Sequence, residues 1–181
     1  MPVIQRITPC LWFERQAEEA ARFYISIFKH SRIIAVRRHS GAGFETNKPS
    51  PGSVMTVAFE LDGQAFTALN GGPGLTFNEA VSMQVNCETQ DDIDYYWQKL
   101  ARGGDANAQQ CGWLKDRYGL SWQIVPTALP DMLKDHQSPQ AWRVMEALMG
   151  MKKIDIDELE RAFAGSPVVG GFSPLSAEEE L

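Results

Sequence analysis

A succession of secondary-structure patterns that occurs twice before Pro126 constrains the fold of this chain most. Each copy has an apolar strand, an amphipathic helix with apolar residues at three- and four-residue spacings, and strands that end in a hairpin. The two helices carry a similar aromatic pair, Phe23-Tyr24 in one and Tyr95-Tyr96 in the other. Phe28 and Leu100 follow five residues after the first aromatic of each pair. A repeat of this kind indicates two duplicated modules.

Each module is expected to have the order βαβββ. The elements expected in the first module are a strand over 4–13, a helix over 14–29, a strand over 31–39 and a hairpin of 54–61 and 64–69. Those of the second are a strand over 80–87, a helix over 89–102 and a hairpin of 112–115 and 120–125, which follows a variable segment. Asp62-Gly63 is a turn pair typical of two-residue hairpins. A four-stranded sheet with one helix keeps an uncovered face, so two modules must pair to enclose a core.

The character of the sequence changes after the second hairpin. Helices are expected over 138–149 and 154–163, and Ser138 is the expected N-cap of the first, before Pro139. Residues 165–181 are rich in Gly, Ser, Pro and Glu, which is typical of a disordered tail. The predicted fold class is therefore α+β. The domains are expected at 1–72 and 73–128 for the two modules, 129–164 for C-terminal helices and 165–181 for the tail.

Charge and composition exclude several classes of function. The net charge of -6 argues against nucleic acid as a partner, because phosphate binding needs a basic patch. The sequence has no apolar run of about 20 residues, so no membrane span is predicted. The first residues lack a secretion signal. Cys10, Cys87 and Cys111 are far apart and odd in number, which favours free thiols in a reducing cytoplasm over a disulfide framework or a thiolate zinc site.

Several short motifs, in this order and spacing, carry a resemblance to a known family. They are 7–13 (ITPCLWF), 17–20 (AEEA), 68–73 (ALNGGP), 77–80 (FNEA), 94–97 (DYYW), 111–116 (CGWLKD) and 119–126 (GLSWQIVP). Together they resemble the PhnB-like branch of the vicinal oxygen chelate superfamily, over residues 4–164. The resemblance implies the fold of glyoxalase I, bleomycin-resistance proteins and extradiol dioxygenases. It also implies a bacterial protein in which subunits can share strands, and a domain often labelled 3-demethylubiquinone-9 3-methyltransferase.

Enzymes of this superfamily hold a divalent metal with side chains from the first and last strands of each module. By register against the glyoxalase pattern, those positions are Thr8, Ala68, Ser82 and Gln123. Only Gln123 is a ligand type that suits zinc, nickel or iron, so we expect no bound metal and no cofactor. None of the three histidines lies on an expected cavity strand: His30, His39 and His136.

The methyltransferase label finds no support in the sequence. A methyl donor bound at a Rossmann-like sheet needs a glycine-rich turn between a strand and a helix. The segment 70–74, Asn-Gly-Gly-Pro-Gly, is followed by a loop and another strand, so we interpret it as a linker. Cys10 as a nucleophile would need a neighbouring base, and no histidine is near it in the sequence.

A polar surface on the sheets remains as the candidate site. The expected ligand-binding residues are Thr8, Cys10, Trp12, Phe66, Asn70, Ser82, Gln84 and Gln123, with Ala68, Asn86, Ser121 and Val125 on the same surface. These polar groups either pair with one another and with water, or orient a small ligand by hydrogen bonds between aromatic walls. The sequence leaves both possibilities open.

The favoured function is metal-independent binding of a small molecule on this polar surface, which we call the cup. The alternatives are a metal-dependent lyase or dioxygenase, and a structural or interaction dimer without a ligand. A homodimer is expected in each case, because curved sheets with several tryptophans leave apolar surface exposed in a monomer. Trp142, Met145 and Met149 of the C-terminal helices are expected to contact the partner.

Overall fold

The computed structural model describes residues 5–40 and 50–165, which form two compact units. The first unit consists of the described residues up to Ser82 together with Lys99–Asp105 and Lys115–Ser121. The second unit is made of Met83–Gln98, Ala106–Leu114 and the chain from Trp122 onward. The expected tail lies outside the described residues, apart from Gly165.

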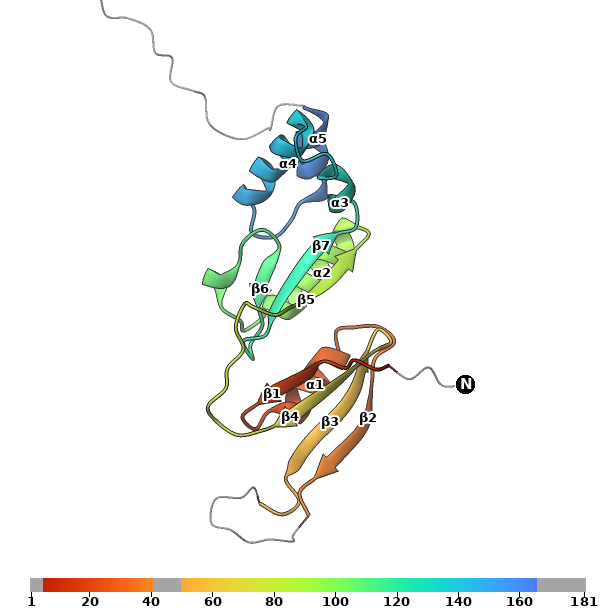
Figure 1. The fold of residues 1–181 in the computed structure, drawn as a ribbon, viewed down its shortest axis with the longest axis vertical. Helices are drawn as coiled ribbons and strands as arrows, with labels where there is room; N and C mark the ends of the chain where they lie inside the picture. The colour runs from red at the N-terminus through yellow and green to blue at the C-terminus, as the bar shows by residue number, and fades with distance from the viewer. Residues whose placement is uncertain (1–4, 41–49, 166–181) are drawn as a thin grey trace, which may run out of the picture. The chain divides into compact units, whose positions relative to one another are not determined.

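The first sheet has four strands in the order β1-β4-β3-β2 (Figure 1). Its elements are β1 (Cys10–Phe13), α1 (Ala17–Ile25), β2 (Arg32–Arg38), β3 (Val54–Leu61) and β4 (Gln64–Asn70). Strand β1 runs parallel to β4, and the other neighbours are antiparallel. The turn residues Asp62 and Gly63 have φ of 46° and 79°, as a two-residue hairpin of type I′ requires. The predicted order βαβββ is confirmed for this module, although β1 is shorter than expected.

The second sheet has three strands in the order β5-β7-β6. Its elements are β5 (Ser82–Cys87), α2 (Gln90–Ala101), the 3₁₀ helix η1 (Ala106–Ala108), β6 (Trp113–Lys115) and β7 (Ser121–Pro126). Strands β5, β7 and β6 take the places that β1, β4 and β3 have in the first sheet, which confirms the repeat. A fourth strand was expected here, and this was wrong for the described chain. Residues 103–108 are Gly, Asp, Asn and Ala, which have low strand propensity, and Ala106–Ala108 form η1 instead.

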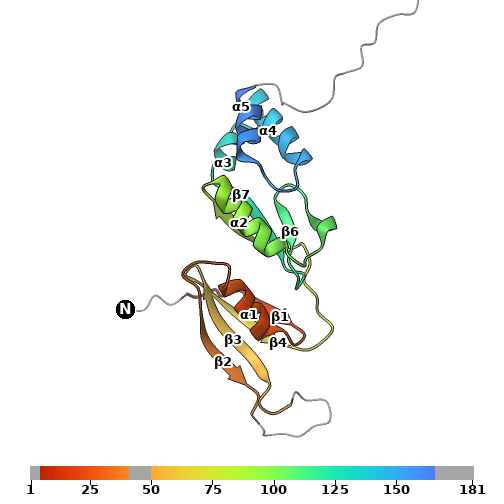
Figure 2. The same cartoon turned by 180° about the vertical axis from the view of Figure 1, so that it is seen from behind.

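Helix α1 covers one face of the first sheet (Figure 2). The sheet residues that face it are apolar and buried: Leu11, Phe13, Val57, Phe59, Leu61, Phe66 and Ala68. They meet Ala17, Ala20, Ala21 and Tyr24 of the helix, all of which are fully buried. Small alanines let the helix approach the sheet closely, and Tyr24 stacks on Phe59 with ring centroids 6.5 Å apart. The opposite face of the sheet is left without a helix of its own module.

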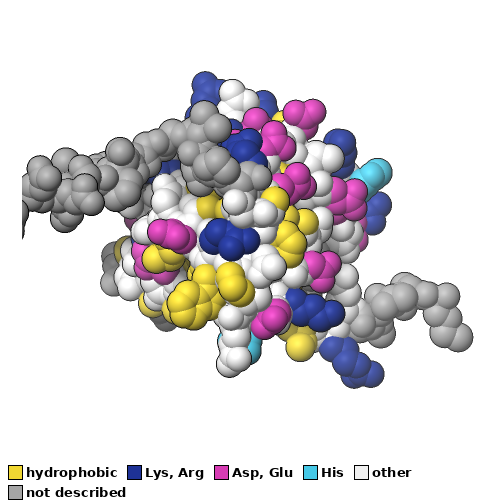
Figure 3. All heavy atoms as spheres, turned by 90° about the horizontal axis from the view of Figure 1, so that it is seen from above, with side chains coloured by type: hydrophobic (Ala, Val, Ile, Leu, Met, Phe, Trp, Pro, Cys, Tyr) yellow, Lys and Arg dark blue, Asp and Glu magenta, His cyan; other side chains and the backbone are white. Residues whose placement is uncertain are grey.

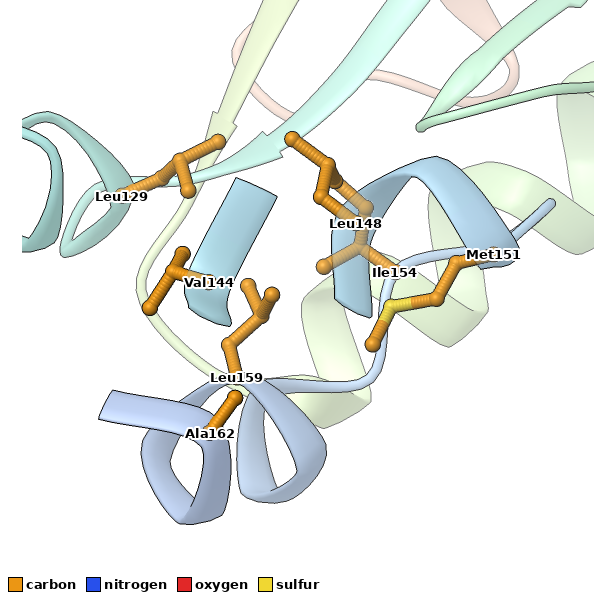
Figure 4. Packing of buried hydrophobic residues seen from close by; sticks show 7 residues of the cluster. All are labelled: Leu129, Val144, Leu148, Met151, Ile154, Leu159 and Ala162. Carbon is orange, nitrogen blue, oxygen red and sulfur yellow. The ribbon is translucent and has the colours of Figure 1, made fainter. Parts of the chain in front are cut away.

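The C-terminal part of the second unit has its own core, shown in Figure 4. It is built from α3 (Leu129–Met132), α4 (Pro139–Gly150) and α5 (Ile156–Ala164). The buried residues are Leu129, Val144, Leu148, Met151, Ile154, Leu159 and Ala162. Ser138 caps α4 as predicted, because its side chain accepts a hydrogen bond from the Ala141 N–H at 3.1 Å. The sequence patterns did not predict α3. No helix within the described ranges has the length and apolar character to cross a membrane.

Candidate functional site

The uncovered side of the first sheet, which we call the open face, is defined by strand register. Three rows of paired residues cross it: Trp12, Leu69, Thr56 and Arg37; Cys10, Thr67, Ala58 and Ala35; and Ala65, Glu60 and Arg32. Paired residues on neighbouring strands point to the same side of a sheet. These residues alternate along the strands with the buried residues that face α1, and they are themselves half-buried or exposed. The open face therefore presents hydroxyl, thiol, charged and aromatic groups.

The expected set Thr8, Cys10, Trp12, Phe66 and Asn70 does not lie on one face. Cys10 pairs with Thr67, which places Cys10 and Trp12 on the open face and Phe66 on the side of α1. Ala68, placed on the cup by the same reasoning, is also on the side of α1 and fully buried. The error is a shift of one residue between β1 and β4, which moves every side chain of the strand to the opposite face. Thr8 is exposed and precedes β1.

Asn70 has a structural task in this module. Its Oδ1 accepts a hydrogen bond from the Ala17 N–H at 2.8 Å, and its Nδ2 donates to the Val54 carbonyl at 3.0 Å. Ala17 is the first residue of α1, whose N-terminal N–H groups have no partner within the helix. Asn70 therefore caps α1 from the end of β4. Its role explains its position without a ligand.

The glycines after β4 accommodate Trp12. A Cβ atom on Gly71 would lie 2.2 Å from the Trp12 ring, and the indole Nε1 donates to the Gly72 carbonyl at 3.0 Å. The chain between β4 and β5 contains no helix. Gly71 and Gly72 therefore leave space for the Trp12 ring and fix its position on the open face. Because residues 70–81 contain no helix, they do not form the strand–turn–helix geometry that binds a phosphate or a methyl donor. This agrees with the interpretation of the segment as a linker.

Strand β5 of the second sheet has the alternation that was predicted for it. Val85 and Cys87 are buried, whereas Gln84 and Asn86 are exposed. The Gln84 amide donates to the Asn86 Oδ1 at 2.7 Å, so these two polar groups pair with each other in part. Ser82 is half-buried and stands on the same side of the strand by alternation.

On β7, Gln123 and its two neighbours in sequence differ in burial. Trp122 and Ile124 are buried, with 3% and 0% of their surface exposed, and Gln123 between them is half-buried. Gln123 therefore points away from the apolar core of its unit. Its amide carries both donor and acceptor groups.

The residues at the superfamily's metal positions do not fit a divalent metal. The open-face neighbours of Ala68 on β4 are Thr67 and Leu69, and neither supplies a carboxylate or an imidazole. Glu60 is on the open face, but it forms an ion pair with Arg32 at 2.9 Å. No group of three His, Cys, Asp or Glu side chains within the described ranges is arranged to hold a metal ion. We therefore derive no chemistry through a metal.

A buried tyrosine and aspartate form a cluster that the sequence patterns did not reveal. Tyr24 of α1 donates from its hydroxyl to Asp116 Oδ2 at 2.8 Å, and both residues are almost fully buried. Asp116 Oδ1 accepts from the N–H groups of Tyr118 and Leu120 at 2.8 and 3.1 Å. Burial, and then the charge of Asp116, hold the pKa of Tyr24 well above its ordinary value. Shifted groups of this kind occur at active sites, but these have no access to a substrate, so the cluster is structural.

Burial also holds the Tyr118 hydroxyl of the first unit and the Cys87 thiol of the second in their neutral forms. Burial, and then a hydrogen bond of 2.8 Å to Glu19, raise the pKa of the Tyr118 hydroxyl. Burial raises the pKa of the Cys87 thiol to about 12, so Cys87 is not a nucleophile near neutral pH.

Comparison with known proteins agrees with the fold and the sequence motifs. The family model described as 3-demethylubiquinone-9 3-methyltransferase matches residues 5–125. A PhnB protein from Bacillus cereus, described with the same enzyme name, is 36% identical, with a TM-score of 0.59 over 68% of this chain and 100% of that chain. A search of curated proteins found no match.

Two more distant structures share the fold alone. Protein PA1353 from Pseudomonas aeruginosa is 18% identical, with a TM-score of 0.54 over 68% of this chain and 98% of that chain. The fosfomycin resistance protein FosX from Listeria monocytogenes, solved with Mn(II) and sulfate, is 13% identical, with a TM-score of 0.50 over 75% of this chain and 100% of that chain. With its motifs, its repeated modules and these matches, the chain belongs to the PhnB-like family, whose family model is described as 3-demethylubiquinone-9 3-methyltransferase.

Proposed function

We propose that this protein binds small organic molecules without a metal ion, on the open face of the first sheet and on the side of the second sheet that carries Gln123. The observation that supports this most is the chemistry of the open face of the first sheet. There Cys10, Thr56 and Thr67 stand beside the aromatic wall of Trp12, on the side opposite α1. A few polar groups among apolar and aromatic side chains are typical of small-molecule sites.

The two enzymatic alternatives have less support. A lyase or dioxygenase of this superfamily needs a set of metal ligands, and the residues at those positions are hydroxyls, aliphatic groups and a single amide. The transferase named in the family description needs a donor-binding turn, and Gly71 and Gly72 instead accommodate Trp12. A binding protein requires neither feature.

Replacing Gln123 by leucine tests the proposal on the second sheet. A library is screened by thermal shift with protein dialysed against a chelator, because a ligand that binds the native state raises its stability. For each ligand found, Gln123→Leu is expected to weaken binding by about 0.5–1.5 kcal/mol, through loss of one hydrogen bond. The melting temperature without ligand should stay near that of the parent, since Gln123 is only half-buried.

The matched control is Gln98→Leu, which makes the same change at an exposed position of α2. It should leave ligand affinity as in the parent. If Gln123→Leu unfolds the protein, or binds every ligand as tightly as the parent does, the proposed role of Gln123 is wrong.

We also propose a homodimer. Helix α4 exposes Trp142, Met145 and Met149, with 68%, 42% and 59% of their surface accessible. Their spacing places them on one side of the helix. Figure 3 shows hydrophobic side chains grouped among charged ones on the face seen from above. A stripe of this kind is typical of a protein interface.

The dimer is tested by sedimentation at micromolar concentration. The parent is expected to sediment at twice the 20.2 kDa of one chain. Met145→Lys should shift the protein toward the monomer, because the charge would be buried without a partner in the interface. Gln140→Lys, an exposed position on another side of α4, is the control and should stay dimeric. A monomeric parent would contradict the proposal.

A reducing compartment such as the cytoplasm is part of the same proposal. All three cysteines are free, and Cys10 is exposed. Exposed free thiols are oxidised readily in secretory compartments. This supports a cytoplasmic location.

A further inference from the structure

The open face of the first sheet has an electrostatic character that the proposed function does not explain. We infer that it recognises an organic anion: a carboxylate or phosphate group bound by Arg37, attached to an apolar or aromatic body that lies toward Trp12 and Leu69. This inference rests on the proposed function and specifies the class of ligand for one of its faces.

The register of β2 places Arg37 on the open face. Arg37 pairs with Thr56, which alternates along β3 with the buried residue Val57. The next residue, Arg38, lies on the opposite side, because its guanidinium contacts Glu18 of α1 at 3.4 Å. A shift in register between the two arginines accompanies this division. Of these two adjacent arginines, Arg38 therefore forms an ion pair with α1, whereas Arg37 lies on the open face.

The charges on the open face do not balance. Glu60 is the one acidic side chain in the three rows, and Arg32 neutralises it at 2.9 Å. Arg37 is exposed and forms no ion pair with any of the described residues. The rows therefore carry two cations and one anion, in a chain whose net charge is -6. A guanidinium left free in this way suits a carboxylate or phosphate, which it binds through paired N–H donors.

The row from Arg37 to Trp12 sets the shape of the ligand. It crosses four strands through Thr56 and Leu69. With about 4.8 Å between neighbouring strands, the Cα atoms at its ends are roughly 14 Å apart. Trp12 is held in place by its hydrogen bond to Gly72 and forms an aromatic wall. The next row is made of small side chains, Cys10, Thr67, Ala58 and Ala35, which leave room above the sheet. A planar body of about two rings with an acidic group at one end fits this arrangement.

The experiment compares three probes on chelator-treated protein by calorimetric titration. The probes are 2-naphthoate, its neutral counterpart 2-naphthamide, and acetate, which has the charge without the rings. The parent is expected to bind naphthoate at least about tenfold more tightly than the other two, because a hydrogen-bonded charge pair contributes roughly this factor. Arg37→Gln should weaken naphthoate binding about tenfold and leave naphthamide binding unchanged.

Arg38→Gln is the matched control, since it removes the same charge one residue away on the opposite face. It should keep the affinity for naphthoate within about twofold of the parent. An equal loss of naphthoate affinity in Arg37→Gln and Arg38→Gln would show a general effect of charge and would overturn the inference. A parent protein that binds none of the three probes would also overturn it. If naphthamide binds as tightly as naphthoate and Arg37→Gln changes neither, the anion inference is wrong while small-molecule binding remains supported.

Discussion

Replacing Asp116 by alanine is expected to lower the free energy of unfolding by about 3–5 kcal/mol. The carboxylate accepts hydrogen bonds from the Tyr24 hydroxyl and from the N–H groups of Tyr118 and Leu120. Its removal leaves three donors without this acceptor in a buried place, and each unsatisfied donor costs roughly 1–3 kcal/mol. Denaturation by urea, monitored by circular dichroism, measures the change.

Two further variants show that the effect belongs to the buried carboxylate. Glu160→Ala removes an exposed carboxylate from α5 and should change stability by less than about 0.5 kcal/mol. Tyr24→Phe removes one of the three donors and should cost about 1–3 kcal/mol, less than Asp116→Ala. A loss below about 1 kcal/mol for Asp116→Ala would contradict the structural role of the cluster.

Replacing Trp122 by alanine is expected to destabilise the protein by about 3–5 kcal/mol, because a large aromatic side chain is removed from a packed core. Trp122 is 3% exposed and lies on the side of β7 opposite Gln123. Any ligand bound by Gln123 should keep its affinity at temperatures where the variant is folded. Melting curves and titrations measure the two quantities separately.

The neighbouring variant Gln123→Leu should show the reverse pattern, with stability within about 1 kcal/mol of the parent and weaker ligand binding. Adjacent residues on one strand would then separate folding from binding. If Trp122→Ala melts like the parent, the assignment of the two faces of β7 is wrong.

Local patterns in the sequence predicted most of the elements. The turn Asp62-Gly63 and the cap Ser138 are signals carried by a few adjacent residues, and the structure has both. Thr89 likewise caps α2, since its hydroxyl accepts from the Asp92 N–H at 3.2 Å. Such features depend on short-range backbone hydrogen bonds, so a single sequence suffices to find them.

The site was predicted less well, because it depends on register between distant strands. The sequence of β4 does not say whether Cys10 pairs with Thr67 or with Ala68, and the choice decides which side chains share a face. For the same reason alternation alone could not assign Arg37 and Arg38, since shifts in register interrupt β2. The contact of Tyr24 with Asp116 joins residues 92 positions apart, and no local pattern reveals it.

The most direct test of metal-independent binding is a nuclear magnetic resonance titration in the presence of a chelator. Isotope-labelled protein is titrated with a ligand found by thermal shift, and the changes in amide resonances are mapped on the chain. Metal-independent binding predicts changes that saturate without added metal and that cluster either on β1 and β4 of the first sheet or on β5 and β7 of the second, where the side-chain amide of Gln123 would be among them. Changes that appear only after a divalent metal is added, or that are confined to α4 and α5, would contradict it.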